Sequence, residues 1–338
     1  SPGRGAHAPA LRAADVVYEC RSALAALFAA QPEQVVFTMN ATHALNLAIK
    51  TLARPGDEVV VSGFEHNSVR RPLHALGARV VIAGRKLFDP GDTLRAFSSA
   101  ITARTRLVVC THVSNVFGYI LPVEEIAALC RARGVPFVLD ASQSAGILPV
   151  RLRELQADFI AMPGHKGLYG PQGTGVLLCA RTPEPLLEGG SGSASREAGM
   201  PRALPDRAEA GTQNAAGIAG LLAGVRFVQR RTPQAIFLHE CALRAAACRA
   251  LGALAEVRVF CGPHQAGTLS FLPRSVPCEQ LAARLSEAGI CLRAGLHCAP
   301  LAHESAGTLE SGTLRLSFSA FNTHAEVRAF AARLKKML

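Results

Sequence analysis

Short apolar runs alternate with segments that carry the apolar spacing of helices through the first half of the chain. The expected strands cover residues 35–37, 58–62, 78–83, 107–111, 136–139 and 159–162, and the expected helices cover residues 11–29, 45–52, 93–101 and 123–133. Strands that alternate with helices are joined by crossovers, which place them in a mainly parallel sheet. The chain is therefore predicted to be an α/β protein.

A second, smaller unit is expected to begin near Arg230. It contains expected helices at residues 235–251 and 278–288, strands near 257–260, 267–271 and 313–318, and a last helix that begins at the capping box of Thr323 and Glu326. We therefore predict a large unit over residues 11–229 and a small α+β unit over residues 230–338. Residues 1–10 are expected to be a loop, and because residue 1 is not methionine the sequence is expected to begin within a longer protein.

The composition limits the class of function. Hydrophobic residues make up 49% of the chain and charged residues 18%, which allows a large core and excludes a disordered protein. The net charge of +11 comes from scattered arginines, and with no tryptophan and 5% aromatic residues the chain is not expected to bind nucleic acid. We read this charge as a preference for anionic ligands.

The ten cysteines contain no C-x-x-C pair, which argues against zinc ribbons and iron–sulfur clusters. Many of them lie in apolar segments, as buried free thiols do, and this usage suits a reducing cytosol. No apolar run approaches the ~20 residues that a membrane span needs, and no signal peptide is visible. A cytoplasmic protein without a metal is predicted.

Polar clusters follow four of the expected strands. They are His66, residues 112–115, residues 140–143 and the loop around Lys166. In a mainly parallel sheet the ligand binds beyond the carboxyl ends of the strands. The sequence therefore predicts one ligand site that is built from all four clusters.

Lys166 lies in a glycine-rich segment directly after an apolar run, and it is one of only five lysines in the chain. A lysine held among small residues near packed strands loses solvation, so its pKa falls and its amine becomes a nucleophile. Such an amine can form a Schiff base with an aldehyde such as pyridoxal phosphate. A surface lysine in a glycine-rich turn is equally compatible with this segment alone.

The segment Asn40-Ala41-Thr42-His43 follows an expected strand and opens an expected helix. The free N–H groups and the dipole at such a helix start can bind a phosphate. An ordinary N-cap by Asn40 or Thr42 fits the same residues.

Taken together, the chain resembles the class V aminotransferase group of pyridoxal-phosphate enzymes, and within it the cysteine desulfurases. The resemblance covers nearly the full length, and it rests on seven motifs in order: Asn-Ala-Thr-His-Ala-Leu-Asn, Glu-His-Asn-Ser, His-Val-Ser-Asn, Asp-Ala-Ser-Gln, Gly-His-Lys, Ala-Gly-Thr-Gln-Asn and Arg-Ala-Gly-Leu-His-Cys-Ala-Pro. It implies fold type I of the pyridoxal-phosphate-dependent transferases, with a seven-stranded-type sheet flanked by helices in the large unit. It also implies a homodimer that takes sulfur from L-cysteine, leaves L-alanine and passes the sulfur to an acceptor protein.

The resemblance assigns cofactor roles to residues in these motifs. Lys166 would hold the cofactor covalently and move the substrate proton, Asp140 would pair with the pyridine nitrogen, and Gln143 would donate to the phenolic oxygen. His66 would stack on the ring and Asn115 would contact the cofactor or the substrate. The phosphate would be held by Ala41, Thr42, His43 and His165, together with Thr212 of a partner subunit. The alternatives are a helix N-cap for Asp140 and a buried structural histidine for His66.

Arg315 interrupts an apolar strand, where an unpaired guanidinium would be costly, so it is expected to meet an anion. The resemblance makes it a clamp on the substrate carboxylate, with Arg293 as a weaker candidate nearby. A structural salt bridge is the alternative.

Cys298 is the residue that distinguishes a desulfurase from its relatives. By the resemblance its thiolate attacks the substrate sulfur and carries it as a persulfide. We expect His297 and a basic environment to lower the pKa of this thiol, and Gly295 and Pro300 to frame a loop that moves. A cysteine placed there by coincidence is the alternative.

Two departures from the family pattern are visible. Pro163 stands where desulfurases commonly carry a hydroxyl residue, and the opening segment of the family is missing before Ser1. Other readings remain open: an aminotransferase, epimerase or cysteine or selenocysteine lyase of the same fold, or an inactive relative that serves as a binding scaffold. A nicotinamide dehydrogenase is disfavoured, because residues 170–175 do not fit G-x-G-x-x-G after a first strand.

Overall fold

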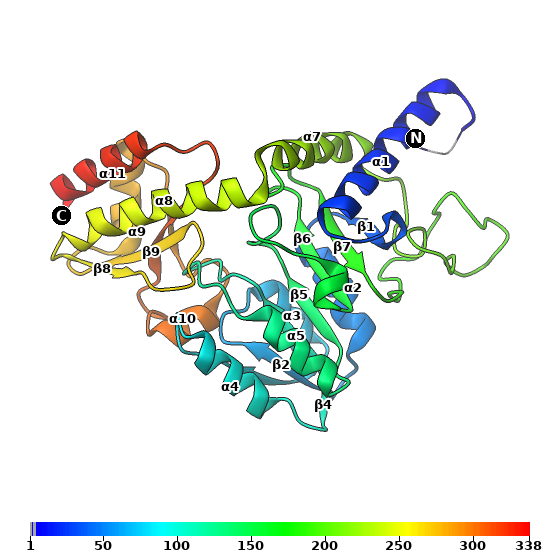
Figure 1. Cartoon of the computed structure of the whole chain (residues 1–338), viewed down its shortest axis with the longest axis horizontal. Helices are drawn as coiled ribbons and strands as arrows, with labels where there is room; N and C mark the ends of the chain where they lie inside the picture. The colour runs from blue at the N-terminus through cyan, green and yellow to red at the C-terminus, as the bar shows by residue number, and fades with distance from the viewer. Residues whose placement is uncertain (1, 3–4) are drawn as a thin grey trace.

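Two β-sheets form the centre of the computed structural model, which describes Pro2 and residues 5–338. The first and larger sheet contains strands from residues 35–179, and the second lies in the C-terminal third of the chain. The long helices α7 (Ala215–Arg231) and α8 (Pro233–Gly252) run across the molecule from the first sheet to the second (Figure 1). We propose that the two units divide at residue 230, near the junction of these helices.

The large sheet has seven strands in the order β1-β7-β6-β5-β4-β2-β3. Their bounds are β1 Val35–Thr38, β2 Glu58–Ser62, β3 Arg79–Ala83, β4 Thr105–Thr111, β5 Phe137–Asp140, β6 Phe159–Pro163 and β7 Gly175–Cys179. Only β7 runs antiparallel to its neighbours, and the other strand pairs are parallel. The predicted seven-stranded, mainly parallel sheet is thus confirmed.

Helices cover both faces of this sheet. Their bounds are α1 Ala8–Leu27, α2 Ala41–Leu52, α3 Asn67–Ala75, α4 Pro90–Ala100, α5 Val123–Ala132 and α6 Leu152–Leu155, with the 3-10 turn η1 at Pro32–Gln34. Side chains of β2 alternate between the two faces: Val59 and Val61 belong to the core that α2 and α3 cover, and Val60 belongs to the core on the opposite face, to which α1, α4, α5 and α7 contribute. The sheet is therefore buried on both sides, as a parallel sheet is expected to be.

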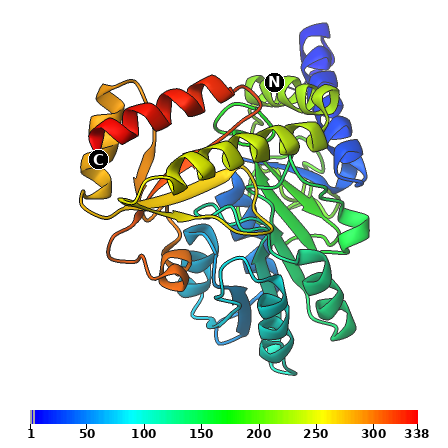
Figure 2. The same ribbon diagram turned by 60° about the vertical axis from the view of Figure 1, so that its left-hand side comes forward.

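The second sheet is antiparallel and has four strands in the order β10-β11-β9-β8. These are β8 Val257–Phe260, β9 Thr268–Pro273, β10 Arg293–Gly295 and β11 Thr313–Ser317, and the helices that accompany them are α9 Cys278–Glu287, α10 Pro300–Ala306 and α11 His324–Met337. One face of this sheet packs against α8, α9 and α11. The rotated view shows α8 and α11 lying across the same side of it (Figure 2).

Helix α10 does not belong to the core of the second sheet. Its Leu301 packs with α2, α3 and the face of the large sheet that these helices cover, whereas Ala302 joins the core on the opposite face. The chain thus returns from the second sheet to complete the core of the first.

Several expected element boundaries were wrong. Helix α1 begins at Ala8, inside the expected loop of residues 1–10, because the His7 side chain accepts a hydrogen bond from the Ala10 N–H and Pro9 fits the first turn. Strands β7 and β10 and helices α3, α6 and α10 were not predicted. The capping box of Thr323 and Glu326 is present at the start of α11. No helix in the described part of the chain is long and apolar enough to cross a membrane.

Candidate active site

The carboxyl ends of the parallel strands surround a cavity of about 250 Å³. All four predicted polar clusters contribute to its wall, from the segments after β2, β4, β5 and β6. The lining residues are Asn40, Ala41, Thr42, His66, Ser68, Thr111, Val113, Asn115, Asp140, Ser142, Gln143, Pro163, His165, Lys166, Arg293, His297 and Arg315. The structure therefore brings together ten of the thirteen predicted site residues, and Cys298 adjoins them in a second cavity described below.

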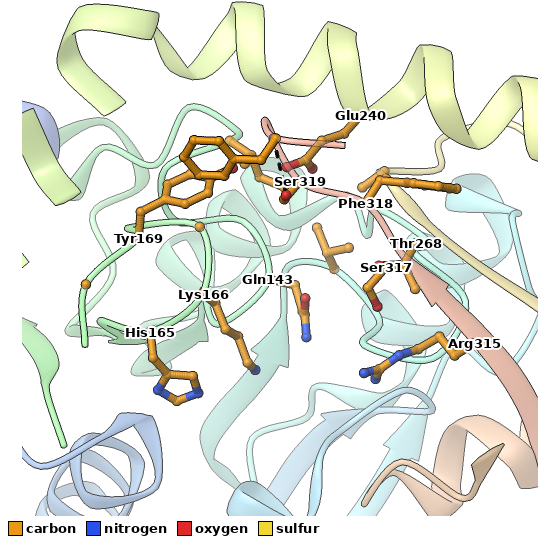
Figure 3. Close-up of a pocket in the computed structure, with 17 residues that line it drawn as sticks. Gln143, His165, Lys166, Tyr169, Glu240, Thr268, Arg315, Ser317, Phe318 and Ser319 are labelled. Carbon is orange, nitrogen blue, oxygen red and sulfur yellow. Dashed lines mark hydrogen bonds between the residues drawn. The ribbon is translucent and has the colours of Figure 1, made fainter. Parts of the chain in front are cut away.

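Lys166 lies in the loop between β6 and β7. Its side chain points into the same space as the side chains of Gln143 and Arg315 (Figure 3). Burial lowers the pKa of Lys166, and the carboxylate of Asp140 opposes that shift. The amine is therefore closer to its neutral, nucleophilic form than a solvated lysine is.

A close backbone contact holds the Lys166 loop against the loop that carries Gln143. A β-carbon on Gly146 would lie 2.1 Å from the carbonyl oxygen of Gly167, and a β-carbon on Gly167 would lie 2.4 Å from the carbonyl oxygen of Ala145. Gly146 also has a φ of +85°, which other residues rarely adopt. Glycine at both positions lets the two loops touch and fixes Lys166 relative to Gln143.

Asp140 is the last residue of β5, and it is only 2% exposed. Its Oδ1 accepts a hydrogen bond of 2.9 Å from the Ser142 N–H. This is the local turn contact that the N-cap alternative predicted, but it leaves the second oxygen available to the cavity. A buried carboxylate beside a lysine can bind a protonated ring nitrogen.

His66 begins α3 as its N-cap, and its Nδ1 accepts a hydrogen bond of 3.0 Å from the Ser68 N–H. Burial lowers the pKa of His66, and the nearby Asp140 carboxylate partly opposes this. The imidazole is thus held neutral in one orientation at the cavity wall.

Arg315 enters the cavity from β11 and donates a hydrogen bond of 2.8 Å to the carbonyl oxygen of Asn115. Its Nε is buried and has no hydrogen-bond partner among the described residues. Burial lowers the pKa of Arg315 to about 10, and the neighbouring Arg293 acts in the same direction. An orphaned donor next to a second cation fits an anionic ligand, because a carboxylate would satisfy the Nε and offset the repulsion.

Asn115 is buried and donates through Nδ2 to the carbonyl oxygen of His297 at 2.8 Å. Through this bond and the bond from Arg315, it links the end of β4 to β11 and to the segment that carries Cys298. Asn115 therefore connects the two sheets at the site.

Cys298 is exposed and lines a separate cavity of about 330 Å³ with Thr42, His66, Asn67 and Arg71. Thr42, His66 and Ser68 also line the Lys166 cavity, so the two cavities share a wall. The backbone of Cys298 has a φ of +60°, and its carbonyl oxygen accepts a hydrogen bond of 2.8 Å from the Asn67 N–H. The thiol is thus presented at the outer side of His66.

His297 does not act as the cation that we expected beside Cys298. It is buried, its Nε2 lies 3.1 Å from the Thr313 carbonyl oxygen, and burial with Arg315 lowers its pKa to about 3. The ring is therefore neutral at pH 7. The cation beside the thiol is Arg293, whose Nη2 lies 3.7 Å from the Cys298 Sγ.

The start of α2 forms one end of the Lys166 cavity. Asn40 is the N-cap, and its Oδ1 accepts a hydrogen bond of 2.9 Å from the His43 N–H. Ala41, Thr42 and His165 line this end. Because α2 is 12 residues long, its N-terminal N–H groups and dipole favour a phosphate here.

His43 and Thr212 line a different cavity, together with Met39, Gly173 and Asn214. The His43 Nδ1 accepts a hydrogen bond of 3.3 Å from the Met39 N–H. Within one subunit these two residues are therefore not brought to the Lys166 cavity. Pro163 does line it, as the last residue of β6, and offers no backbone N–H.

Glu65 is a residue that the sequence reasoning missed. It is fully buried, and its Oε1 accepts hydrogen bonds from the Ser62 hydroxyl and, at 2.7 Å, from the Thr111 N–H. Burial raises the pKa of Glu65 to about 8, and the nearby Asp140 carboxylate acts in the same direction. Its position before His66 in the Glu-His-Asn-Ser motif was the available signal.

Comparisons with known proteins agree with this geometry. The model of the family described as aminotransferase class-V matches residues 1–330. The chain belongs to the class V aminotransferases. It is 34% identical over 351 residues to the probable cysteine desulfurase of Methanothermobacter thermautotrophicus, and the match covers 99% of this chain and 87% of that protein.

Solved structures are also similar to this chain. The apo cysteine desulfurase of Thermococcus onnurineus has a TM-score of 0.90 and 34% identity, with coverage of 99% of this chain and 86% of the other. A C-DES mutant with glycine covalently linked to its PLP cofactor has a TM-score of 0.83 and 25% identity, with 97% and 87% coverage. The predicted family and its fold are thereby confirmed.

The class V family uses pyridoxal phosphate, and the cavity fits that group. Its donor set combines a lysine with a lowered pKa, a buried carboxylate and the start of a 12-residue helix. These are suited to an aldehyde, a pyridine nitrogen and a phosphate, respectively.

Proposed function

We propose that this protein is a pyridoxal-phosphate-dependent cysteine desulfurase, which converts L-cysteine to L-alanine and retains the sulfur as a persulfide on Cys298. The observation that carries the proposal is the shared wall between the Lys166 cavity and the Cys298 cavity. One cavity holds the groups for amino-acid chemistry, and the other holds the Cys298 thiol together with Thr42, His66 and Ser68, which line both cavities.

Within the site, Asp140, Gln143, Asn115 and His66 would hold the cofactor ring, and Ala41, Thr42 and His165 would hold its phosphate. The bound group supplies an electron sink for the carbanion that forms at the substrate α-carbon. Lys166 would take the proton from that carbon, because burial lowers the pKa of its amine and shifts it toward the neutral form. The buried carboxylate of Asp140 would pair with the ring nitrogen and favour its protonated form.

Arg315 would bind the substrate carboxylate. Its orphaned Nε and its Nη groups offer a planar fork that suits two carboxylate oxygens. Arg293, which is exposed and lies beside the Cys298 Sγ, would stabilise the thiolate rather than anchor the substrate. This assigns separate tasks to the two arginines.

The sulfur step balances without an added oxidant or reductant. The Cys298 thiolate attacks the sulfur of the substrate, the carbon–sulfur bond breaks, and the new sulfur–sulfur bond leaves a persulfide on the protein. The substrate carbon keeps the bond's electron pair and takes up a proton, so that L-cysteine becomes L-alanine. A later attack by an acceptor thiol would return Cys298 to its starting state.

We also propose a homodimer, in which His43 and Thr212 of each subunit approach the phosphate end of the partner's site. The support is that these two residues share a cavity outside the Lys166 site of their own subunit, next to exposed Met39 and Leu187. A sulfur-acceptor protein is proposed as the further partner, because the Cys298 thiol is exposed. The free thiols support a reducing compartment, the cytoplasm.

The function is tested by measuring alanine and sulfide formation from L-cysteine in the presence of a thiol reductant. Lys166→Ala and Cys298→Ser should both abolish turnover, but only Lys166→Ala should lose the covalent attachment of the cofactor, read by mass spectrometry after borohydride reduction. Lys86→Ala and Cys291→Ser are matched controls at exposed positions and should retain activity.

Sulfide release that survives Cys298→Ser would contradict a persulfide mechanism and favour a lyase of the same fold. A wild-type protein that does not bind pyridoxal phosphate would contradict the enzymatic proposal altogether and support the scaffold reading.

A further inference from the structure

Two cysteines meet beside the second sheet, outside the cavities of the proposed reaction. Cys248 lies on α8, one turn after Arg244, and Cys261 directly follows β8, which packs against α8. The Arg244 guanidinium reaches the Cys261 thiol, and the side chains of the two cysteines interact. Neither occurs among the described residues that line the Lys166 or Cys298 cavities. The pair therefore has no task in the proposed desulfurase mechanism.

The two thiols have different surroundings. Cys261 is exposed, and the Arg244 guanidinium donates to its Sγ through Nη1 at 3.4 Å. Cys248 is a partly buried residue of α8, and burial raises its pKa to about 11. A cation beside a sulfur stabilises the thiolate, which is the form that attacks other sulfurs. Cys261 is thus placed as the attacking thiol and Cys248 as a second thiol within its reach.

Arg244 is held in place from both sides of the loop after β8. Its Nη1 also donates to the Gln265 Oε1 at 3.1 Å, and Gln265 donates in turn to the carbonyl oxygens of Phe117 at 2.8 Å and Phe260 at 3.0 Å. The guanidinium, the loop and the end of β8 form one hydrogen-bonded unit. These hydrogen bonds therefore hold the Arg244 guanidinium in position beside Cys261.

A metal site does not explain the cluster. Within residues 5–338 no group of three His, Cys, Asp or Glu side chains is arranged to hold a metal ion. Cys241, one turn before Arg244 on α8, directs its thiol to the Gln265 carbonyl oxygen at 3.7 Å instead. The cluster consequently contains two thiols and a guanidinium, which are the groups that thiol–disulfide exchange requires.

We propose that Cys248 and Cys261 form a dithiol site that reacts with small-molecule disulfides and closes to an intramolecular disulfide. The Cys261 thiolate attacks one sulfur of the disulfide, whose sulfur–sulfur bond breaks and releases the other half as a thiolate. Cys248 then loses its proton and attacks the Cys261 Sγ, which releases the remaining half as a thiol. The small disulfide is reduced to two thiols, and the protein dithiol is oxidised by the same two electrons.

The test uses the cofactor-loaded full chain with oxidised glutathione as the probe. After timed exposure, free thiols are alkylated, the protein is digested without reductant, and cysteine peptides are mapped by mass spectrometry. The wild type should yield a Cys248–Cys261 cross-linked peptide that disappears with dithiothreitol. Arg244→Gln should form it about three- to tenfold more slowly, because the thiolate loses its cation.

Single-cysteine variants separate the two roles. Cys248→Ser should stop at a glutathione adduct on Cys261, whereas Cys261→Ser should yield neither the adduct there nor the cross-link. Cys291 is an exposed cysteine outside the cluster and serves as the control position, which should react more slowly than Cys261 in the wild type. A stable wild-type adduct on Cys261 without cross-linking would overturn the proposal. So would a cross-link to Cys241, or equal rates at Cys261 and Cys291.

Discussion

Lys166 and Asp140 line one cavity beyond the ends of two adjacent parallel strands, and the Asp140 carboxylate is the opposite charge that acts most strongly on the lysine. Burial pushes the pKa of the amine down, and the carboxylate pushes it up. The nucleophilicity of Lys166 therefore depends on the charge of Asp140.

Replacement of Asp140 by asparagine should preserve the shape of the site and remove that charge. We expect kcat for alanine formation to fall by at least about 100-fold, because the ring nitrogen loses its charged partner, an electrostatic contribution of several kcal/mol. The pKa of the Lys166 amine should also fall further, since the group that raised it is gone. Steady-state kinetics measure the first effect, and the pH dependence of Lys166 labelling by an amine-reactive reagent in the cofactor-free protein measures the second. Unchanged values of both would refute the assignment of Asp140.

Arg315→Lys should weaken the binding of L-cysteine more than it slows the reaction. Lysine keeps the charge but cannot form the planar double contact, and loss of one charged hydrogen bond costs about 1.5–3 kcal/mol, or roughly 10- to 150-fold in KM. The matched control is Arg274→Lys, at an exposed arginine that donates to the Ala255 carbonyl oxygen. An Arg315→Lys enzyme with a normal KM would show that another group binds the carboxylate.

Glu65→Gln should change the pH dependence of stability. The pKa of Glu65 is about 8 in the folded protein and near 4.5 in an unfolded chain, so the folded state retains a proton that the unfolded state releases. The contribution of the Glu65 carboxyl group to the free energy of unfolding therefore falls as pH rises from about 4.5 to 8. A glutamine at this position does not titrate, so its contribution does not change with pH. The Tm of Glu65→Gln, relative to wild type, should therefore rise between pH 5 and pH 8. A constant difference would place the folded pKa of Glu65 near its usual value.

The buried pair of Arg21 and Glu209 ties α1 to the long segment before α7. Two contacts of 2.9 Å join the guanidinium to both carboxylate oxygens, and Glu209 also accepts from the Phe37 N–H at 2.6 Å. Arg21→Met should destabilise the protein by about 3–5 kcal/mol, because an unpaired carboxylate stays buried. Arg21→Met with Glu209→Gln should recover part of this loss. Urea denaturation of both variants measures it, and equal losses would contradict the pairing.

Gly146→Ala should displace the Lys166 loop without touching any proposed catalytic group. Its β-carbon would lie 2.1 Å from the Gly167 carbonyl oxygen at a φ of +85°, so one of the two loops must move. We expect a loss of kcat together with a lower Tm. The control is Gly77→Ala, where φ is also positive at +69° but no atom lies within 4 Å of the new β-carbon. Equal effects of both variants would show that the contact between the loops is unimportant.

The sequence predicted the large sheet well because its strands are continuous apolar runs between helical patterns. Strand β7 was not predicted, because it has only five residues, begins at Gly175 and directly follows a glycine-rich loop, so its apolar pattern is short. Helix α10 was missed for a similar reason: seven residues are too few to show a helical period. Short elements inside a packed fold are stabilised by their neighbours, and their own sequence carries little signal.

The site was predictable where a motif ends a strand, as at Asp140 and Lys166. The prediction that His297 would be a cation beside Cys298 was wrong. Burial and the Arg315 guanidinium lower its pKa, and the residues responsible are distant from His297 in the sequence. His43 is separated from the other candidate phosphate-binding residues by the orientation of α2. This orientation cannot be deduced from the local sequence. Tertiary surroundings, rather than local pattern, decide both.

Helix α10 has a consequence for biosynthesis. Leu301 and Ala302 fill places in the two cores of the large sheet, yet they are made long after residue 229 has left the ribosome. A nascent chain that ends before α10 would expose apolar surface on both faces of that sheet and depend on chaperones to stay in solution. The two proposed units are therefore expected to reach their final state together, once nearly the entire polypeptide has emerged.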